Sequence, residues 1–190
     1  MQSLERAQTR VEVYAIKVTL LGTSPPVWRR ILVPRDITLR SLHRTLQTVM
    51  GWTDSHLHQF VFQKQSLSDP RSRVGRKVAY ENRTKLGELI RTAGAKLLYE
   101  YDFGDGWQHE LLLEEVLLGD ESFQQICVAG KRSCPPEDCG GPQGFAERLK
   151  ALQNANDPSH EEVCAWLGDF VPESFSADET NRRLRRRRKH

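Results

Sequence analysis

The segment YEYDFGDGWQHE, residues 99–110, places two carboxylates at a tight turn and an imidazole shortly after it. Asp102 and Asp105 could together hold a hard cation or take part in acid–base chemistry. On a strand that follows the turn, Trp107 and His109 would share one face. The alternative is structural, because Asp and Gly are favoured in turns for backbone reasons. The segment therefore predicts either a functional site or a structural turn.

A second segment, CVAGKRSCPPEDCGGPQG, combines thiols with two acids. Cys127, Cys134 and Cys139 are suitable zinc ligands, but their spacing of six and then four residues does not match the closely paired cysteines of a zinc finger. Prolines before the acids and glycines after them predict a rigid loop that leads into a helix. Glu137 and Asp138 would lie near the helix N-terminus, where acids are stabilised by the dipole and could also form a site.

Two further histidines, His56 and His58, would project from the same face of a strand. Imidazole is a good ligand for transition metals. These histidines, with His109 and the three clustered cysteines, could form a mixed site for zinc or another divalent metal. A separate hypothesis is a nucleophilic thiol at Cys139, which would need a lowered pKa. The sequence leaves open whether the protein is an enzyme.

The C-terminal end reads RRLRRRRKH, with seven Lys and Arg and no acid. Because the whole chain carries a net charge of +3, the chain without these seven residues carries −4. A basic globular face for nucleic acid is therefore not indicated, whereas a basic tail could bind polyanions through salt-sensitive contacts. The alternative is a disordered end that only solubilises the protein. The tail residues that would contact nucleic acid are Arg185, Arg186, Arg187, Arg188 and Lys189.

Length and composition predict one globular domain, because 190 residues with 38% hydrophobic and 28% charged side chains can form a full core. The polar first ten residues contain no secretory h-region, and no apolar run is long enough to span a membrane. We therefore expect a cytoplasmic protein, whose cysteines would not form structural disulfides. The expected boundaries are a flexible segment 1–10, a domain 11–181 and a disordered basic tail 182–190.

Hydrophobic periodicity predicts the elements that position these segments. Residues 12–21 and 27–33 read as a β-hairpin, and Thr38 as the N-cap of an amphipathic helix that ends near Gly51. This ββα opening is β-grasp-like in shape. The order of elements predicts an α+β fold with a mixed or antiparallel sheet and helices packed on one side. Further strands are expected at 56–63, 96–103 and 107–116, a loop at 64–83, and helices at 85–93, 145–155 and 161–167.

Five segments, in this order, strongly resemble the plasmid pRiA4b ORF-3-like family: VYAIKVTLLGTSPPVWRRILVP, HLHQFVF, YEYDFGDGWQHEL, CVAGKRSCPPEDCGGPQGF and WLGDFVPESF. The resemblance covers roughly residues 12–184, and the motifs DFGDGWxH and CPPEDCGG are specific to it. It implies an α+β domain of unassigned activity, and a binding or accessory role in plasmid or mobile-element biology. Members are also labelled "TnpR" passenger proteins of an insertion element. Resolvase activity is not implied, because a resolvase catalytic domain and a helix-turn-helix reader are both missing from this sequence.

Overall fold

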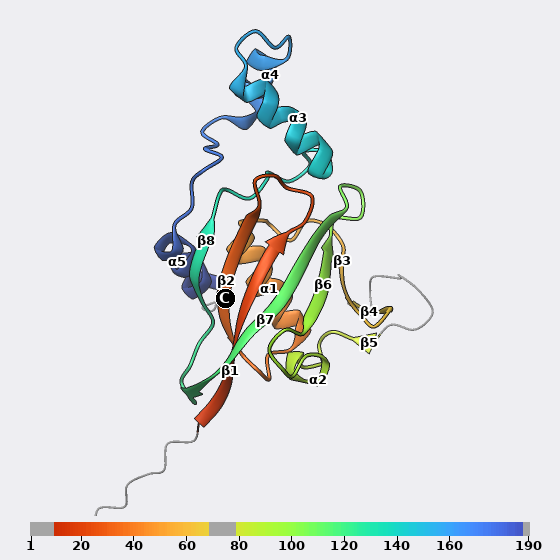
Figure 1. Cartoon of the computed structure of the whole chain (residues 1–190), viewed down its shortest axis with the longest axis vertical. Coiled ribbons are helices and arrows are strands. Elements are labelled where there is room, and N and C mark those ends of the chain that lie inside the picture. The colour runs from red at the N-terminus through yellow and green to blue at the C-terminus, as the bar shows by residue number, and fades with distance from the viewer. Residues whose placement is uncertain (1–9, 69–78, 188–190) are drawn as a thin grey trace, which may run out of the picture.

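A single eight-stranded sheet forms the centre of the molecule, with strand order β5-β4-β3-β6-β7-β1-β2-β8 (Figure 1). The structure is a computed structural model that describes residues 10–68 and 79–187. All neighbouring strands are antiparallel except β4 and β5, which are parallel. The predicted α+β class with a mixed sheet is confirmed. The strands are β1 (Arg10–Leu20), β2 (Val27–Pro34), β3 (His58–Phe62), β4 (Gln65–Ser68), β5 (Ala79–Tyr80), β6 (Lys96–Tyr101), β7 (Trp107–Asp120) and β8 (Ile126–Lys131).

Helix α1 (Leu39–Met50) covers one face of this sheet and closes the main core. The Thr38 side chain accepts a hydrogen bond from the N–H of Ser41, and Gly51 ends the helix with a φ of 88°. These are the predicted cap residues, and they work because Thr satisfies a free N–H and Gly adopts the left-handed conformation at no steric cost. Leu42 and Leu46 are fully buried against the sheet.

The other helices are α2 (Leu86–Leu89), α3 (Gly141–Gln153), α4 (His160–Leu167) and α5 (Ala177–Arg187). Helices α3 and α4 pack on each other and project beyond one end of the sheet, so they do not cover its face (Figure 1). Helix α5 packs against β8 and α1. The predicted packing of all helices on one side is therefore incomplete. None of the helices in the described parts of the chain is long and apolar enough to cross a membrane.

Three segments differ from the sequence predictions. The expected loop 64–83 contains β4 and β5, and residues 126–131 form the additional edge strand β8. Residues 182–187, predicted to belong to a disordered tail, continue helix α5, where Leu184 is buried. Thr180 and Leu184 are the buried residues of this otherwise polar helix, and tertiary packing of this kind supplies most of the stability of helices in proteins. Arg188, Lys189 and residues 1–9 lie outside the described residues.

Candidate functional site

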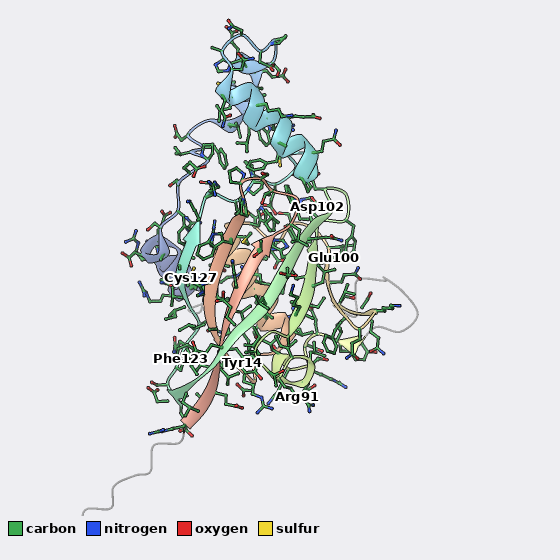
Figure 2. The ribbon with its side chains drawn as sticks, viewed as in Figure 1. Tyr14, Arg91, Glu100, Asp102, Phe123 and Cys127 are labelled. Carbon is green, nitrogen blue, oxygen red and sulfur yellow. The ribbon has the colours of Figure 1, made fainter. Side chains whose placement is uncertain are left out.

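The β6–β7 turn holds Asp102 in a left-handed conformation with a φ of 55°. Its Oδ1 accepts hydrogen bonds from the N–H groups of Gly104, at 3.0 Å, and Asp105, at 3.3 Å. This is the usual turn chemistry of Asp, which tolerates positive φ better than most residues. Oδ2 lies 3.7 Å from Nδ1 of His56. Asp102 lies at the end of the sheet from which α3 projects (Figure 2).

The loop from Cys134 to Gly140 docks directly on this turn. The N–H of Gly140 donates to Oδ2 of Asp105 at 3.2 Å. A Cβ at Gly141 would lie 2.2 Å from the carbonyl oxygen of Asp105, so only glycine permits this approach. On the other side of the loop, the indole N–H of Trp52 donates to the carbonyl of Pro135 at 2.9 Å. The two motif segments are thus one packed unit.

Three side chains from separate segments meet where the two loops touch. His56 precedes β3, Asp102 lies in the β6–β7 turn, and Asp138 lies in the loop before α3. Nε2 of His56 is 3.3 Å from Oδ1 of Asp138. One donor atom from each residue lies within 4.8 Å of the others, which is close enough for shared binding of a metal ion. We call this group the His56 site.

The charge around the His56 site is unbalanced. Asp102, Asp105, Glu137 and Asp138 gather there, and within the described parts of the chain no Lys or Arg forms an ion pair with any of them. The Asp138 side chain is 76% exposed. Nε2 of His56 is shielded from solvent, and no described residue forms a hydrogen bond with it. Uncompensated carboxylates beside an available imidazole attract a cation.

Glu137 lies next to Asp138 and is held in place by hydrogen bonds. Its carboxylate accepts hydrogen bonds from the Tyr101 hydroxyl and from Thr53, whose hydroxyl lies at 2.5 Å and whose N–H lies at 3.2 Å. Burial raises the pKa of Tyr101 well above its usual range, and the hydrogen bond and negative charge of Glu137 raise it further. Tyr101 therefore keeps its proton and donates a hydrogen bond to Glu137. The position of Glu137 depends on the tertiary structure, because its partners lie on two distant segments.

Trp107 and His109 share a buried face, as their spacing predicts, but they lie in the core. Nδ1 of His109 lies 3.3 Å from the carbonyl oxygen of Tyr99, and the ring packs edge-on against Trp52. Burial lowers the pKa of His109 to about 3, so the ring is neutral at physiological pH. These two residues support the turn and belong to neither group of clustered potential metal ligands within the described residues.

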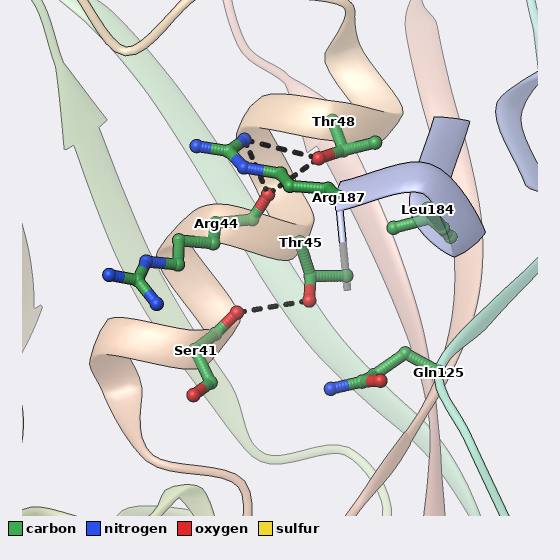
Figure 3. A pocket seen from close by; sticks show the side chains of 7 residues that line it. All are labelled: Ser41, Arg44, Thr45, Thr48, Gln125, Leu184 and Arg187. Atoms are coloured by element: carbon green, nitrogen blue, oxygen red, sulfur yellow. Dashed lines mark hydrogen bonds between the residues drawn. The ribbon is translucent and has the colours of Figure 1, made fainter. Parts of the chain in front are cut away.

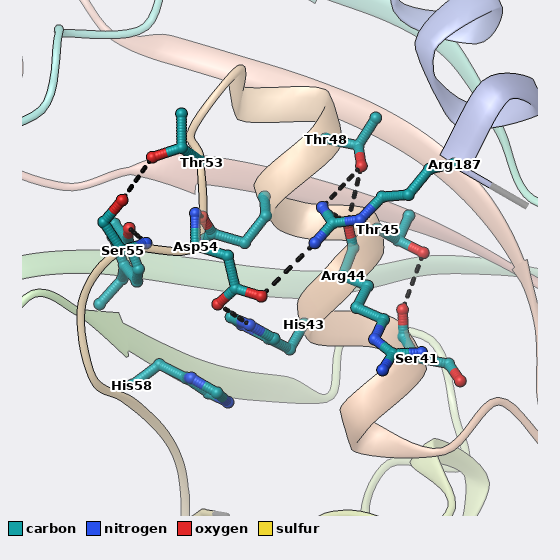
Figure 4. A network of polar contacts seen from close by, with 12 residues as sticks. Ser41, His43, Arg44, Thr45, Thr48, Thr53, Asp54, Ser55, His58 and Arg187 are labelled. Carbon is teal, nitrogen blue, oxygen red and sulfur yellow. Dashed lines mark hydrogen bonds and ion pairs between the residues drawn. The ribbon is translucent and has the colours of Figure 1, made fainter. Parts of the chain in front are cut away.

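His58 lies apart from His56, in a second group with His43 and Asp54 (Figure 4). His58 also pairs with Glu81, and we call these four residues the His43 cluster. Nε2 of His43 is 2.7 Å from Oδ1 of Asp54, and Nε2 of His58 is 2.7 Å from Oε2 of Glu81. Sequence reasoning assigned no role to His43, Asp54 or Glu81, because they are distant in the chain and carry no motif.

The two imidazoles of the His43 cluster stack face to face, with ring centroids 3.5 Å apart and planes within 4° of parallel. A metal ion bound to one nitrogen of His43 and one nitrogen of His58 would have to lie in the planes of both rings. Stacked parallel rings do not allow this. The Tyr99 hydroxyl lies 2.8 Å from Nδ1 of His43 and accepts a hydrogen bond from Gln47. Burial, assisted by His58, lowers the pKa of His43 to about 4. The cluster is a closed hydrogen-bond network.

The cysteines lie outside both groups and form no disulfide. Burial raises the pKa of Cys127 and of Cys139 to about 11, and raises that of Cys134 further. A nucleophilic thiol needs the opposite shift, so the environment of Cys139 argues against that hypothesis. Cys127 and Cys134 also lie within electrostatic range of the cationic Arg29, which disfavours a metal ion there.

Comparisons with known proteins identify the family of this chain. The family model described as plasmid pRiA4b ORF-3-like protein matches residues 12–179. The chain belongs to this family. A relative of the pRiA4b ORF-3-like chain is the uncharacterized protein y4hQ of Sinorhizobium fredii (strain NBRC 101917 / NGR234). It is 36% identical over 167 residues, which cover 87% of this chain and 86% of the relative.

A solved structure has the same fold as the pRiA4b ORF-3-like chain. It is the crystal structure of MM3350, a protein of unknown function from Methanosarcina mazei Go1, with a TM-score of 0.81 and 37% identity. The match covers 90% of this chain and 98% of MM3350. Neither relative's name describes an activity.

Proposed function

We propose that this pRiA4b ORF-3-like protein is a metal-binding protein and that His56, Asp102 and Asp138 hold one divalent ion. The observation that carries the proposal is the meeting of three donor atoms, from three separate segments, within 4.8 Å. Within the described residues, no Lys or Arg forms an ion pair with these carboxylates. A bound cation would supply the missing positive charge.

The surroundings of the His56 site support binding with little rearrangement. Turn N–H groups fix Asp102, and the contact between Gly140 and Asp105 holds the backbone beside Asp138. Glu137 lies next to the site and is itself held by hydrogen bonds. Outer contacts of this kind orient metal ligands and raise affinity.

The donor set favours a transition metal. One imidazole with two carboxylates suits Mn²⁺, Fe²⁺ or Zn²⁺, whereas Ca²⁺ and Mg²⁺ prefer oxygen donors alone. The cysteines contribute no ligand in this proposal. Because the Asp138 side chain is exposed, an ion bound there would keep positions open to solvent and could bind an anionic partner or polarise water.

The test is a titration of the purified, chelator-treated protein with MnCl₂ and with ZnCl₂. Calorimetry measures binding of both ions, and electron paramagnetic resonance also measures binding of Mn²⁺. We expect one ion per chain. Asp102→Asn and Asp138→Asn should each weaken binding at least about 10-fold. Asn suits these variants because it tolerates the positive φ of both positions, and at Asp102 it can keep accepting the turn hydrogen bonds.

His56→Ala should abolish stoichiometric binding, and His160→Ala is the matched control. His160 is a half-buried histidine on α4, outside both groups of potential ligands. Loss of binding in the control, or unchanged affinity in all three site variants, would refute the proposal. Mass spectrometry under native conditions gives the stoichiometry independently.

We also propose an accessory role in plasmid or mobile-element biology, with nucleic acid bound by helix α5 in the cytoplasm. The family description names a plasmid, and all four cysteines are free thiols, as expected for that compartment. Arg182, Arg185 and Arg186 are exposed on α5 and form no ion pair with a described residue, whereas Arg183 pairs with Glu179. Arg187 hydrogen-bonds to α1 and lines a groove of about 260 Å³ with the exposed Arg44 (Figure 3).

Helix α5 changes how this second role should be tested. Deleting residues 182–190 would also remove the buried Leu184, so a folding defect would be mistaken for lost binding. The better variant replaces Arg182, Arg185 and Arg186 with Gln. Its DNA affinity should fall uniformly across sequences, and the dependence of log affinity on log salt should become shallower by up to about three. Unchanged affinity and salt dependence would exclude these residues.

A further inference from the structure

Arg29 is a charged residue in the buried row of strand β2. Val27, Ile31 and Val33 occupy the same row, and Arg29 is only 3% exposed. Its guanidinium lies 4.4 Å from the centre of the Phe175 ring. A buried charge is costly unless it is paired, so its partners need to be identified.

The partners of Arg29 are backbone carbonyls. Nε donates to Val49 at 3.0 Å, and Nη1 donates to Trp28 at 2.8 Å and to Lys131 at 3.0 Å. Among the described residues, no carboxylate lies within ion-pair distance of the Arg29 guanidinium. No described residue of any type accepts a hydrogen bond from its Nη2. Carbonyl dipoles orient the guanidinium but leave its charge of +1 uncompensated.

A pocket of about 240 Å³ opens beside this guanidinium, between β2, the end of α1 and residues 170–183. Its other charged lining residues, Glu179 and Arg183, form an ion pair at 2.7 Å and neutralise each other. The pocket therefore has a net charge of +1, which comes from Arg29. Phe170 and Phe175 add an aromatic part to the lining.

Two hydroxyls in the pocket still have a proton to donate. The Ser176 hydroxyl accepts from the N–H of Glu179, which leaves its own proton free, and Ser174 Oγ makes no hydrogen bond with a described residue. The other two hydroxyls, on Ser133 and Thr180, already donate to carbonyls. Donors, one net cation and aromatic walls in one pocket match an amphipathic anion.

We propose that this pocket binds a small organic anion. Its oxyanion, a carboxylate or a phosphate monoester, pairs with Nη2 of Arg29 and with the hydroxyls of Ser174 and Ser176, and its apolar part packs on Phe170 and Phe175. The Arg29 pocket shares no residue with the His56 site, so the inference does not depend on metal binding.

The experiment measures binding to the full-length protein by calorimetry at constant ionic strength. The probes are inorganic phosphate, phenyl phosphate and phenylacetate, with NaCl as the reference salt. We expect saturable binding of at least one aromatic anion, tighter than that of inorganic phosphate because of the aromatic wall. Phenyl phosphate and phenylacetate distinguish a phosphate ligand from a carboxylate ligand. Absence of saturable binding of all three up to about 10 mM would overturn the proposal.

The decisive variant is Ser174→Asp, which introduces a carboxylate beside Arg29 and competes with the ligand. It should fold, because it pairs the buried charge, and it should weaken binding at least about 10-fold. Ser174→Ala, which removes one donor, is the second variant and should weaken binding by about threefold or more. Arg44→Ala, in the separate groove of Figure 3, should leave the affinity unchanged. Binding that survives both Ser174 variants, or that is lost in Arg44→Ala, would refute the assignment.

Discussion

The His56 site and the His43 cluster combine the same residue types but differ in how completely their polar groups are satisfied. The loop before β3 contributes a residue to each group: Asp54 belongs to the His43 cluster and His56 to the His56 site. In the His43 cluster, each imidazole lies 2.7 Å from its carboxylate, and the side chains of His43 and Glu81 are 4% and 2% exposed. In the His56 site, the corresponding distances are 3.3 and 3.7 Å.

This difference separates a stabilising role from a binding role. A closed, buried network has no donor or acceptor left for a ligand, so its free energy contributes to folding. An open cluster of like charges gains little in the free protein and becomes favourable when a cation arrives. Residue type alone therefore does not identify a metal site.

The largest expected effect is a loss of stability in acid. In the folded protein, the pKa values of His43 and His109 lie near 4 and 3, below the ordinary 6.5 that applies in the unfolded chain. Between about pH 6.5 and these values the unfolded chain binds more protons. The contribution of the two histidines to the free energy of unfolding should therefore be fully present above pH 6.5. It should fall as the pH is lowered, by up to about 1.4 kcal/mol per pH unit for each histidine.

Denaturant titrations from pH 7 to pH 4 measure this dependence. His43→Ala should roughly halve the slope of the free energy of unfolding against pH, because only His109 would still contribute to that slope. A free energy of unfolding that stays constant between pH 7 and pH 4 would contradict the buried, neutral state of both rings.

A smaller effect is expected from substitution at neutral pH. His43→Ala removes hydrogen-bond partners of Tyr99 and Asp54 and the stacking partner of His58, so unfolding should become easier by about 3 kcal/mol. His56→Ala, in the open site, should cost less than about 1 kcal/mol in the metal-free protein. Chemical denaturation at pH 7 measures both. Equal losses in the two variants would mean that the two clusters do not differ as described.

The smallest effect is expected at the edge of the His43 cluster. Nη2 of Arg187 lies 3.4 Å from Oδ2 of Asp54, and both side chains are more than one-third exposed. Arg187→Ala should lower the free energy of unfolding by about 0.5 kcal/mol, since solvent screens such pairs. A loss as large as that of His43→Ala would place Arg187 within the closed network, and thermal unfolding of the single and double variants distinguishes the two outcomes.

Sequence reasoning identified the elements whose signals are local. The alternation in β1 and β2 and the caps of α1 at Thr38 and Gly51 are properties of short segments, and the structure has them at the predicted positions. Strands β4, β5 and β8 and helix α5 were missed because they are short or polar. Strand β4 pairs with the neighbouring β3 and with β5, whereas β8 pairs with the distant β2, and α5 docks through Leu184 on segments far away in the chain.

The sequence by itself also located the two motif segments, with Asp102, Glu137 and Asp138 among the candidate residues. Their backbone requirements, which are positive φ at Asp102, Gly140 and Gly141, are encoded locally. Only the tertiary structure decided that these segments touch, that His56 joins them and that His58 does not. It also decided that His109, Cys127 and Cys139 are buried. Burial, pairing and the pKa values that follow from them depend on which distant segments pack together, and the spacing of residues along one chain does not specify that packing.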